Sequence, residues 1–204
     1  MLPLYFLNTY YSDAKAIEKK YGISAVFMLA QSAHETGWGK HTPGNMMFGI
    51  KAGEGARTQK KETWECRPTG EEIITTLPPP NEKCGSSTAY KVYATFATYR
   101  SPRESFEDYY HFLADNPRYA KVLSLKNNPD RMAEEIAKAG YATDPAYTSK
   151  LKSTIAKVKF YWPLVEATQG SLQYARRNTW IFIILLLLLA VVIFYFIKFK
   201  PFSR

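Results

Sequence analysis

An uninterrupted apolar segment near the carboxyl end constrains the fold more than any other feature of this 204-residue chain. Residues 180–197 read WIFIILLLLLAVVIFYFI and contain no charged residue, glycine or proline. A helix of about 18 residues is about long enough to cross the hydrocarbon of a bilayer. Arg176 and Arg177 precede it and Lys198 and Lys200 follow it, as is common beside membrane spans. A buried core helix, the alternative, rarely lacks polar residues on every face. The segment predicts one transmembrane helix, with a lipid bilayer as partner.

The positive net charge is distributed unevenly, and much of it lies close to this apolar segment. The chain carries 27 Lys and Arg against 18 Asp and Glu, a formal net charge of +9. No acidic residue follows Glu166, whereas five basic residues do. Without those five, 22 basic and 18 acidic residues remain, and the body has a net charge of only +4. Because dedicated nucleic-acid binders concentrate more positive charge on their folded part, we expect no nucleic-acid partner.

The chain is predicted to have four parts. Residues 1–166 form the folded domain, 167–179 a linker, 180–197 the transmembrane helix and 198–204 a basic tail. The apolar residues between positions 2 and 7 are not preceded by Lys or Arg, and no small-residue cleavage site follows them. A cleavable secretory signal is therefore not expected.

The body is predicted to be an α+β domain, mostly helical, with a small β-hairpin lobe. Residues 2–20 show apolar side chains at helical spacing, and Gly22 breaks the pattern. Residues 51–98 are rich in turn formers and end in an alternating segment, 90–96, which is typical of a hairpin. Polar caps, three of them followed by proline, predict the starts of the other helices: Ser24, Ser101, Asn128 and Asp144.

Glu35 is the residue whose setting best fits catalysis. It is predicted to end the apolar helix that starts after Ser24, directly before Gly37 and Trp38. Desolvation, an aromatic neighbour and the negative end of the helix dipole would each raise the pKa of its carboxyl group. A carboxyl that stays protonated near neutrality suits a general acid. An exposed glutamate without a role is the alternative. Trp38 stands where a zinc protease would need a second histidine after His34, and we expect no metal or cofactor.

Three ordered blocks of sequence resemble the bacterial glucosaminidase family, glycoside hydrolase family 73, which includes autolysins and flagellar peptidoglycan hydrolases. The blocks are residues 23–40, 45–51 and 139–147. The second matches a pattern usually written Asn-x-Phe-Gly-x-Lys. The resemblance covers roughly residues 3–162 and does not include the apolar segment. It implies a lysozyme-like fold with a cleft between a helical lobe and a β-hairpin lobe. It also implies hydrolysis of the β-1,4 bond after N-acetylglucosamine in peptidoglycan.

The resemblance also assigns roles to individual residues. Glu35 matches the general acid of the family, and Tyr141 matches a tyrosine that borders the cleft. Glu65 occupies the most suitable place for a second carboxylate, with Glu62 and Glu54 as alternatives. This group would activate water or stabilise an oxocarbenium-like transition state. Four further residues are expected to shape the site, either by stacking on a sugar or by packing: Trp38, Asn45, Phe48 and Tyr147.

Two other features leave alternatives open. His34 stands where many members of the family have a small or aliphatic residue, and it could tune the pKa of Glu35. Cys66 and Cys84 flank the proline-rich part of the hairpin region. They could form a disulfide in an oxidising compartment, or remain two free thiols.

The leading functional prediction is a membrane-anchored peptidoglycan hydrolase. A lytic transglycosylase or muramidase on the same fold is one alternative. A catalytically inert wall-binding or virion structural membrane protein is another. The charges beside residues 180–197 are too balanced to set the membrane orientation. We expect either insertion in the bacterial cell envelope, or a phage protein that is held in a virion or host membrane and used in entry or lysis.

Overall fold

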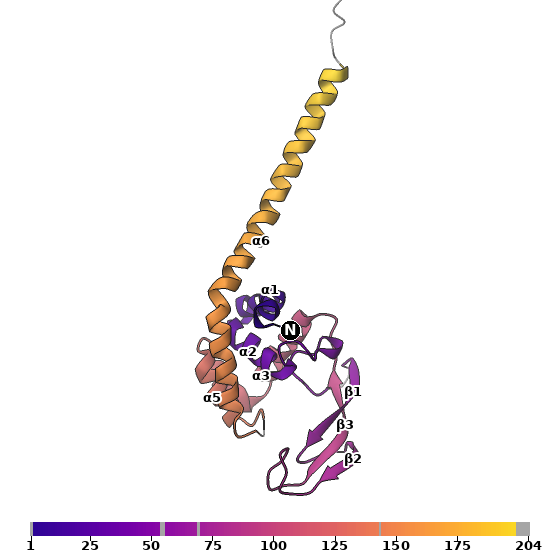
Figure 1. Cartoon of the computed structure of the whole chain (residues 1–204), viewed down its shortest axis with the longest axis vertical. Coiled ribbons are helices and arrows are strands. Elements are labelled where there is room, and N and C mark those ends of the chain that lie inside the picture. Colours follow the sequence, from indigo (N-terminus) through magenta and orange to yellow (C-terminus); the bar gives the residue numbers. More distant parts are fainter. Residues whose placement is uncertain (1, 54–55, 69, 143, 199–204) are drawn as a thin grey trace, which may run out of the picture. The chain divides into compact units, whose positions relative to one another are not determined.

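The computed structural model describes residues 2–53, 56–68, 70–142 and 144–198 (Figure 1). Within the last helix, the side chains of residues 182, 185, 186 and 193–198 are not described. The chain divides into two compact units, Met1–Tyr161 and Trp162–Arg204. Each unit is described by itself.

Helix α2 (Ala25–Thr36) lies at the centre of the first unit, and most of its side chains are fully buried. It begins where predicted, because the Ser24 hydroxyl accepts a hydrogen bond from the Phe27 amide at 3.3 Å. Helix α1 (Pro3–Tyr21) packs on both α2 and α3 (Pro102–Ala114). The first helix thus covers the helix that carries Glu35.

The remaining helices of this unit follow α3. They are the 3-10 helix η2 (Pro117–Tyr119), α4 (Ala120–Ser124), α5 (Pro129–Lys138) and the first part of α6. Helices α3 and α5 start at the predicted caps, since Ser101 accepts from the amide of Glu104 and Asn128 from that of Arg131. The sequence did not predict η2 and α4, whose inward side chains are Tyr119 and Val122.

The β lobe is a three-stranded antiparallel sheet rather than the predicted hairpin. Its strands β1 (Thr58–Glu65), β2 (Glu72–Leu77) and β3 (Ala89–Ala97) are ordered β1-β3-β2. Strand β3 is the shared middle strand, with Thr63 and Ile73 both opposite Val92. Cys66, directly after β1, forms a disulfide with Cys84, and their Cα atoms are 5.5 Å apart. Apart from its third strand, the fold matches the prediction of a mostly helical domain with a small sheet.

The segment that carries the second motif block joins the sheet to the helices. The amide of Ala97 donates to the carbonyl of Ile50, and the amide of Ala52 donates to the carbonyl of Thr95, both at 3.0 Å. Tyr99, just beyond β3, donates its amide to the carbonyl of Gly44 at 2.8 Å. The end of β3 therefore fixes the backbone on either side of Phe48.

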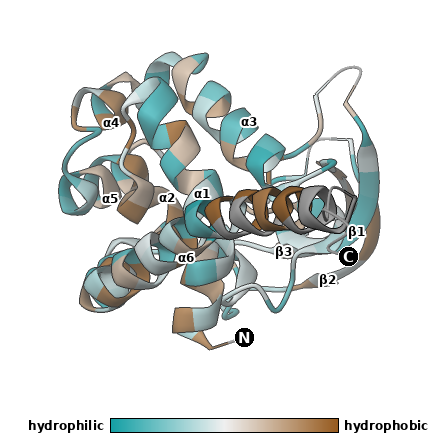
Figure 2. Cartoon of the chain, turned by 90° about the horizontal axis from the view of Figure 1, so that it is seen from above, coloured by the Kyte–Doolittle hydropathy of each residue, from teal (hydrophilic) through white to brown (hydrophobic). Residues whose placement is uncertain are grey.

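Helix α6 (Tyr147–Lys198) begins in the first unit and continues through the second, with Pro163 inside it. Residues 167–179, the predicted linker, are helical. Figure 2 shows hydrophobic residues along the described part of α6. Across the residues that the structure describes, however, no helix is both long and apolar enough to cross a membrane. The predicted transmembrane helix is therefore not supported by the structure. Several of its side chains, and residues 199–204 of the predicted basic tail, lie outside the described residues.

Candidate active site

Glu35 lies in the last turn of α2, and a left-handed turn follows it at once. Gly37, Trp38 and Gly39 have φ values of 58°, 60° and 75°. The amide of Trp38 donates to the carbonyl of Ala33 at 2.7 Å. Two of the three residues are glycines, which adopt this conformation without strain, and Trp38 is the exception. The turn ends the helix at the point where the Glu35 side chain leaves the buried core.

A cavity of about 380 Å³ opens beside Glu35. The Glu35 side chain is accessible to solvent from this cavity, while protein surrounds it on its other sides. A reagent in the cavity can thus reach the carboxyl group. The residues that line the cavity come from α2, the second motif block, α3, η2 and the loop after α5: Glu35, Phe48, Gly49, Ile50, Lys51, Phe112, Arg118, Tyr119 and Tyr141.

The surroundings of Glu35 hold its carboxyl group in an unusual protonation range. Burial disfavours the ionised form and raises the pKa of Glu35 to about 7, against a hydrogen bond from Tyr147 that acts to lower it. The Tyr147 hydroxyl donates to Glu35 Oε1 at 3.1 Å. A carboxyl with this pKa is substantially protonated at neutral pH, as a general acid requires.

Tyr147 is held in turn by two buried polar residues. Its hydroxyl accepts a hydrogen bond from Gln31 Nε2 at 3.0 Å. The Gln31 side-chain oxygen accepts from the hydroxyl of Tyr109. Gln31 lies one helical turn before Glu35 on α2, whereas Tyr109 comes from α3 and Tyr147 from the start of α6. A series of side-chain hydrogen bonds therefore connects α3 and α6 to the Glu35 carboxyl on α2.

Tyr141, the residue that the family resemblance assigns to the border of the cleft, lines the same cavity. Its hydroxyl donates to the carbonyl of Phe48 at 3.0 Å. Phe48 is itself buried and stacks on Tyr109, with ring centroids 4.0 Å apart. Burial, with Glu35 as a further cause, holds the pKa of Tyr141 well above its usual value. Tyr141 therefore keeps its proton and can serve as a hydrogen-bond donor.

Lys51 connects the cavity to two carboxylates of the sheet lobe. Its ammonium group lies 3.2 Å from Glu65 and 2.7 Å from Glu71. Glu65 is the predicted second carboxylate. Glu71, just before β2, was not predicted. Neither lines the cavity itself, but both meet the lysine that does. Both carboxylates therefore stay candidates for the second acidic group.

Glu62 and Glu54 are the other two candidates for the second carboxylate, and Glu62 pairs with a lysine other than Lys51. Glu62 and Glu65 are three residues apart on β1, so their side chains point to opposite faces of the strand. Glu62 forms an exposed ion pair with Lys91 and accepts a hydrogen bond from Tyr93 at 3.3 Å. The Lys91 ammonium lowers the pKa of this carboxyl. Glu54 lies outside the described residues.

The remaining predicted site residues support the site rather than line its cavity. Trp38 packs edge-on against Phe6 at a centroid distance of 5.7 Å. Asn45, which also has a positive φ of 56°, donates its side-chain amide to the carbonyl of Tyr99 at 3.0 Å. Tyr147 is only 3% exposed. In this structure it therefore reaches the site through its hydroxyl and cannot stack on a sugar.

His34 contacts the ring of Tyr147 edge-on, with centroids 5.4 Å apart. Burial and the nearby Lys150 lower its pKa, and Asp144 opposes them. The imidazole is thus mostly neutral at pH 7. Whether it tunes the pKa of Glu35 stays a prediction.

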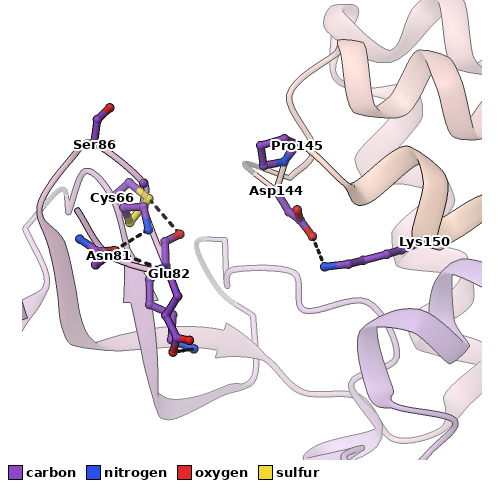
Figure 3. Close-up of a pocket in the computed structure, with 10 residues that line it drawn as sticks. Cys66, Asn81, Glu82, Ser86, Asp144, Pro145 and Lys150 are labelled. Atoms are coloured by element: carbon purple, nitrogen blue, oxygen red, sulfur yellow. Dashed lines mark hydrogen bonds and ion pairs between the residues drawn. A yellow bond between two sulfur atoms is a disulfide. The ribbon is translucent and has the colours of Figure 1, made fainter. Parts of the chain in front are cut away.

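A second cavity, of about 510 Å³, lies between the disulfide loop and the start of α6 (Figure 3). Asp144 and Lys150, 2.6 Å apart, form one wall. On the other wall the Asn81 side-chain oxygen accepts from the amide of Cys84 at 2.7 Å and shapes the loop. Among the residues that the structure describes, no group of three or more His, Cys, Asp or Glu could hold a metal ion.

The fold and the cavity together define a class of protein. A half-enclosed carboxyl that titrates near neutrality stands on a helical wall, and further carboxylates stand on a neighbouring sheet, as in glycoside hydrolases. Comparison with known families agrees. The chain belongs to the glucosaminidase family, because the family model described as mannosyl-glycoprotein endo-beta-N-acetylglucosaminidase matches residues 11–160. The resemblance seen in the three motif blocks is confirmed.

Individual proteins with similar sequences include peptidoglycan hydrolases named FlgJ. The chain is 31% identical to the peptidoglycan hydrolase FlgJ of Pseudomonas aeruginosa over 169 residues, which are 79% of this chain and 38% of that protein. It is 32% identical to FlgJ of Vibrio parahaemolyticus over 164 residues, or 77% of this chain and 48% of that protein. The chain thus spans less than half the length of these relatives.

Solved structures show the same fold. The glycoside hydrolase domain of Salmonella typhimurium FlgJ superposes with a TM-score of 0.62 at 28% identity, and the match covers 84% of this chain and 97% of that domain. The catalytic domain of the autolysin Auto from Listeria monocytogenes superposes with a TM-score of 0.57 at 26% identity, over 77% of this chain and 84% of that one.

Proposed function

We propose that this chain is a peptidoglycan hydrolase that cleaves the β-1,4 bond after N-acetylglucosamine. The observation that carries the proposal is the Glu35 carboxyl, whose pKa is raised to about 7 at the wall of an open cavity. The family match to an endo-beta-N-acetylglucosaminidase supports the choice of bond. The names of the FlgJ relatives as peptidoglycan hydrolases support the choice of polymer.

In the proposed reaction, protonated Glu35 donates its proton to the glycosidic oxygen as the bond to the anomeric carbon breaks. Positive charge develops on that carbon and on the ring oxygen. Glu65 or Glu71 would stabilise this charge or activate the incoming water, unless the acetamido group of the substrate does so. Water adds its hydroxyl to the anomeric carbon, and its remaining proton restores the acid. The leaving sugar keeps the proton that Glu35 supplied.

Product analysis of digested peptidoglycan tests this proposal directly. We expect fragments with N-acetylglucosamine at the reducing end, identified by borohydride reduction and mass spectrometry. Anhydro-sugar ends would instead identify a lytic transglycosylase, and N-acetylmuramic acid at the reducing end a muramidase. Equal wall clearing by the wild type and a folded Glu35→Gln variant would leave the inert wall-binding protein as the better description.

We further propose that the chain is attached to a membrane through residues 180–197, either in a bacterial envelope or in a virion or host membrane of a phage. Only the sequence supports this placement, through 18 consecutive apolar residues flanked by basic ones. Extraction of membranes with alkaline carbonate tests attachment, and we expect the chain to remain in the pellet. Protease protection in spheroplasts and in any associated particles then tests on which side the body lies. Full release by carbonate would disprove the attachment.

A further inference from the structure

Gln31 is a polar residue that the proposed reaction does not use, and it is fully buried in the middle of α2. A primary amide costs free energy when it is removed from water unless its groups find partners. Both ends of the Gln31 amide have one. Its oxygen accepts from the Tyr109 hydroxyl, and its nitrogen donates to the Tyr147 hydroxyl at 3.0 Å. Gln31 thus links two tyrosines that lie 38 residues apart in the chain.

The hydrogen bonds in this set can run in one direction only. The Gln31 nitrogen donates but has no lone pair with which to accept. The Tyr147 hydroxyl, which accepts from this nitrogen, cannot donate back to it. Its own proton is therefore directed to its other partner, Glu35 Oε1, at 3.1 Å. Tyr109 thus donates to Gln31, Gln31 donates to Tyr147, and Tyr147 donates to Glu35 Oε1, which acts only as an acceptor.

This direction determines where the proton of a neutral Glu35 can reside. Oε1 accepts the Tyr147 proton, so in the protonated acid it is the carbonyl-like oxygen. The acidic proton is left on Oε2, the oxygen to which Tyr147 does not donate, and the Glu35 side chain lines the open cavity. A general acid works only if its proton points at the leaving oxygen.

We propose that Gln31 and Tyr147 are positioning residues that keep the Glu35 proton on Oε2, through a one-way hydrogen-bond chain that begins at Tyr109. The inference rests on the proposed function for its purpose but not for its geometry. Gln31 orients Tyr147, and Tyr147 reserves Oε1. Neither side chain needs to touch the glycan, since Gln31 is fully buried and Tyr147 nearly so.

Other ionisable groups near Glu35 do not provide this function. Three phenols face it from α3, the loop after α5 and α6, and burial raises the pKa of each, so all stay neutral. His34, beside it on α2, has a lowered pKa and faces Asp144 and Lys150. Two cationic side chains, Lys51 and Arg118, also line the cavity. The full set is Tyr109, Tyr141, Tyr147, His34, Asp144, Lys150, Lys51 and Arg118.

The test replaces each link without removing its bulk. Tyr147→Phe keeps the ring but removes the donor to Oε1, and Gln31→Met keeps the length of the side chain but removes the donor to Tyr147. Tyr99→Phe is the matched control. This substitution also deletes a hydroxyl that makes a hydrogen bond, to Asp108 at 2.7 Å. Tyr99 is not part of the hydrogen-bond series from Tyr109 to Glu35. Thermal unfolding of all three variants of the full-length chain shows whether each is folded.

The first readout is a ¹³C NMR titration of the Glu35 carboxyl, which needs no substrate. Loss of a hydrogen bond to the ionised carboxylate destabilises that form, so the pKa of Glu35 should rise by about 1 unit in Tyr147→Phe. In Gln31→Met it should rise by about half as much, because Tyr147 is misoriented rather than removed. In Tyr99→Phe it should not change. An unchanged pKa in folded Tyr147→Phe would overturn the inference, whatever the enzyme cleaves.

The second readout is the pH profile of peptidoglycan hydrolysis. The alkaline limb of kcat should move upward with the NMR value, kcat at the optimum should fall by about tenfold in Tyr147→Phe, and KM should change by less than about twofold. A rise in KM with kcat unchanged would mean that Tyr147 binds substrate, and would contradict the positioning role. If the wild type does not cleave peptidoglycan, the proposed function fails while the NMR result still decides the inference.

Discussion

Different kinds of interaction hold the helical wall of the Glu35 cavity and the sheet lobe, or sheet wall, which reaches the cavity through Lys51. On the helical wall, Glu35 accepts a hydrogen bond from Tyr147, Tyr147 accepts one from buried Gln31, and Phe48 stacks on Tyr109. On the sheet wall, Glu65 and Glu71 are held by one exposed lysine, Lys51, and every residue of β2 is exposed. Buried hydrogen bonds in a low-dielectric setting are strong, whereas exposed ion pairs contribute about 0–1 kcal/mol.

The difference explains why the two acidic groups are not equally well defined. Burial raises the pKa of Glu35, so we expect changes in the residues packed around it to alter its protonation. On the sheet lobe, Glu65 and Glu71 both contact the same Lys51. We infer that the general acid is fixed by the fold, whereas the second carboxylate depends on the local arrangement of the lobe.

The largest effect should come from the helical wall. Glu35→Gln removes the acidic proton but keeps the acceptor for Tyr147, and we expect kcat to fall by about 10²–10⁴-fold. The wall-clearing assay measures the loss, and the circular dichroism spectrum should match that of the wild type. Activity within about threefold of the wild type would show that the helical wall does not carry the acid.

The next largest effect should come from removing the disulfide, and it should lower the stability of the sheet lobe. Replacing both cysteines, Cys66→Ser and Cys84→Ser together, removes a cross-link between residues separated by 18 positions. In the chain-entropy account this lowers the free energy of unfolding by about 3 kcal/mol. We expect a lower midpoint in urea.

Hydrogen exchange locates that loss. Amides of β1 and β3 should exchange faster in the double serine variant, while those near Gln31 should keep their protection, because the helical wall has its own core. Equally faster exchange in both regions would show that the helical wall and the sheet lobe do not unfold independently. Finding both thiols free by mass mapping under non-reducing conditions would show that the cross-link is not formed.

A smaller effect should separate the candidates for the second carboxylate. Glu65→Gln and Glu71→Gln each remove a charge beside Lys51, and we expect one of them to lower kcat by about 10–100-fold, or about 1.4–2.7 kcal/mol. Glu62→Gln is the control, since Glu62 lies on the opposite face of β1 and pairs with Lys91. It should stay within about twofold. If all three leave kcat unchanged, the acetamido group of the substrate is the better candidate.

The smallest effect concerns stability. The pKa of Glu35 is about 7 in the folded chain, against an ordinary 4.5. Between these values the folded state binds a proton that the unfolded state has lost, so stability falls as pH rises through this window. Glu35→Gln removes that loss. Allowing for the solvent access of the side chain, the gain above pH 7 should be about 1 kcal/mol, or about 2–4 °C in Tm.

Differential scanning calorimetry at pH 4 and pH 8 measures this gain as the difference between the variant and the wild type. The difference should be larger at pH 8, because both carboxyl and amide are uncharged at pH 4. An equal difference at the two pH values would mean that the carboxyl is not desolvated in the folded chain.

The sequence predicted those features that depend on neighbours in the chain. Ser24, Ser101 and Asn128 were found as caps because capping needs only the next three residues. Glu35 was found because its motif, its helix and its turn are contiguous. The missed features join distant segments. The third strand β2 is defined by its pairing with β3, and the bonds of Gln31 reach Tyr109 and Tyr147, 78 and 116 residues away.

The cross-link between Cys66 and Cys84 also makes the lobe a suitable place for protein engineering. It closes residues 66–84, which contain β2, into a loop, and β1 and β3 pair along their length outside that loop. Doubling the length of a flexible loop adds only about 0.6 kcal/mol of closure entropy. A reporter or an affinity peptide inserted near Pro78 should therefore leave the β1–β3 register intact. The same scaffold could then carry interchangeable recognition loops beside one fixed acid.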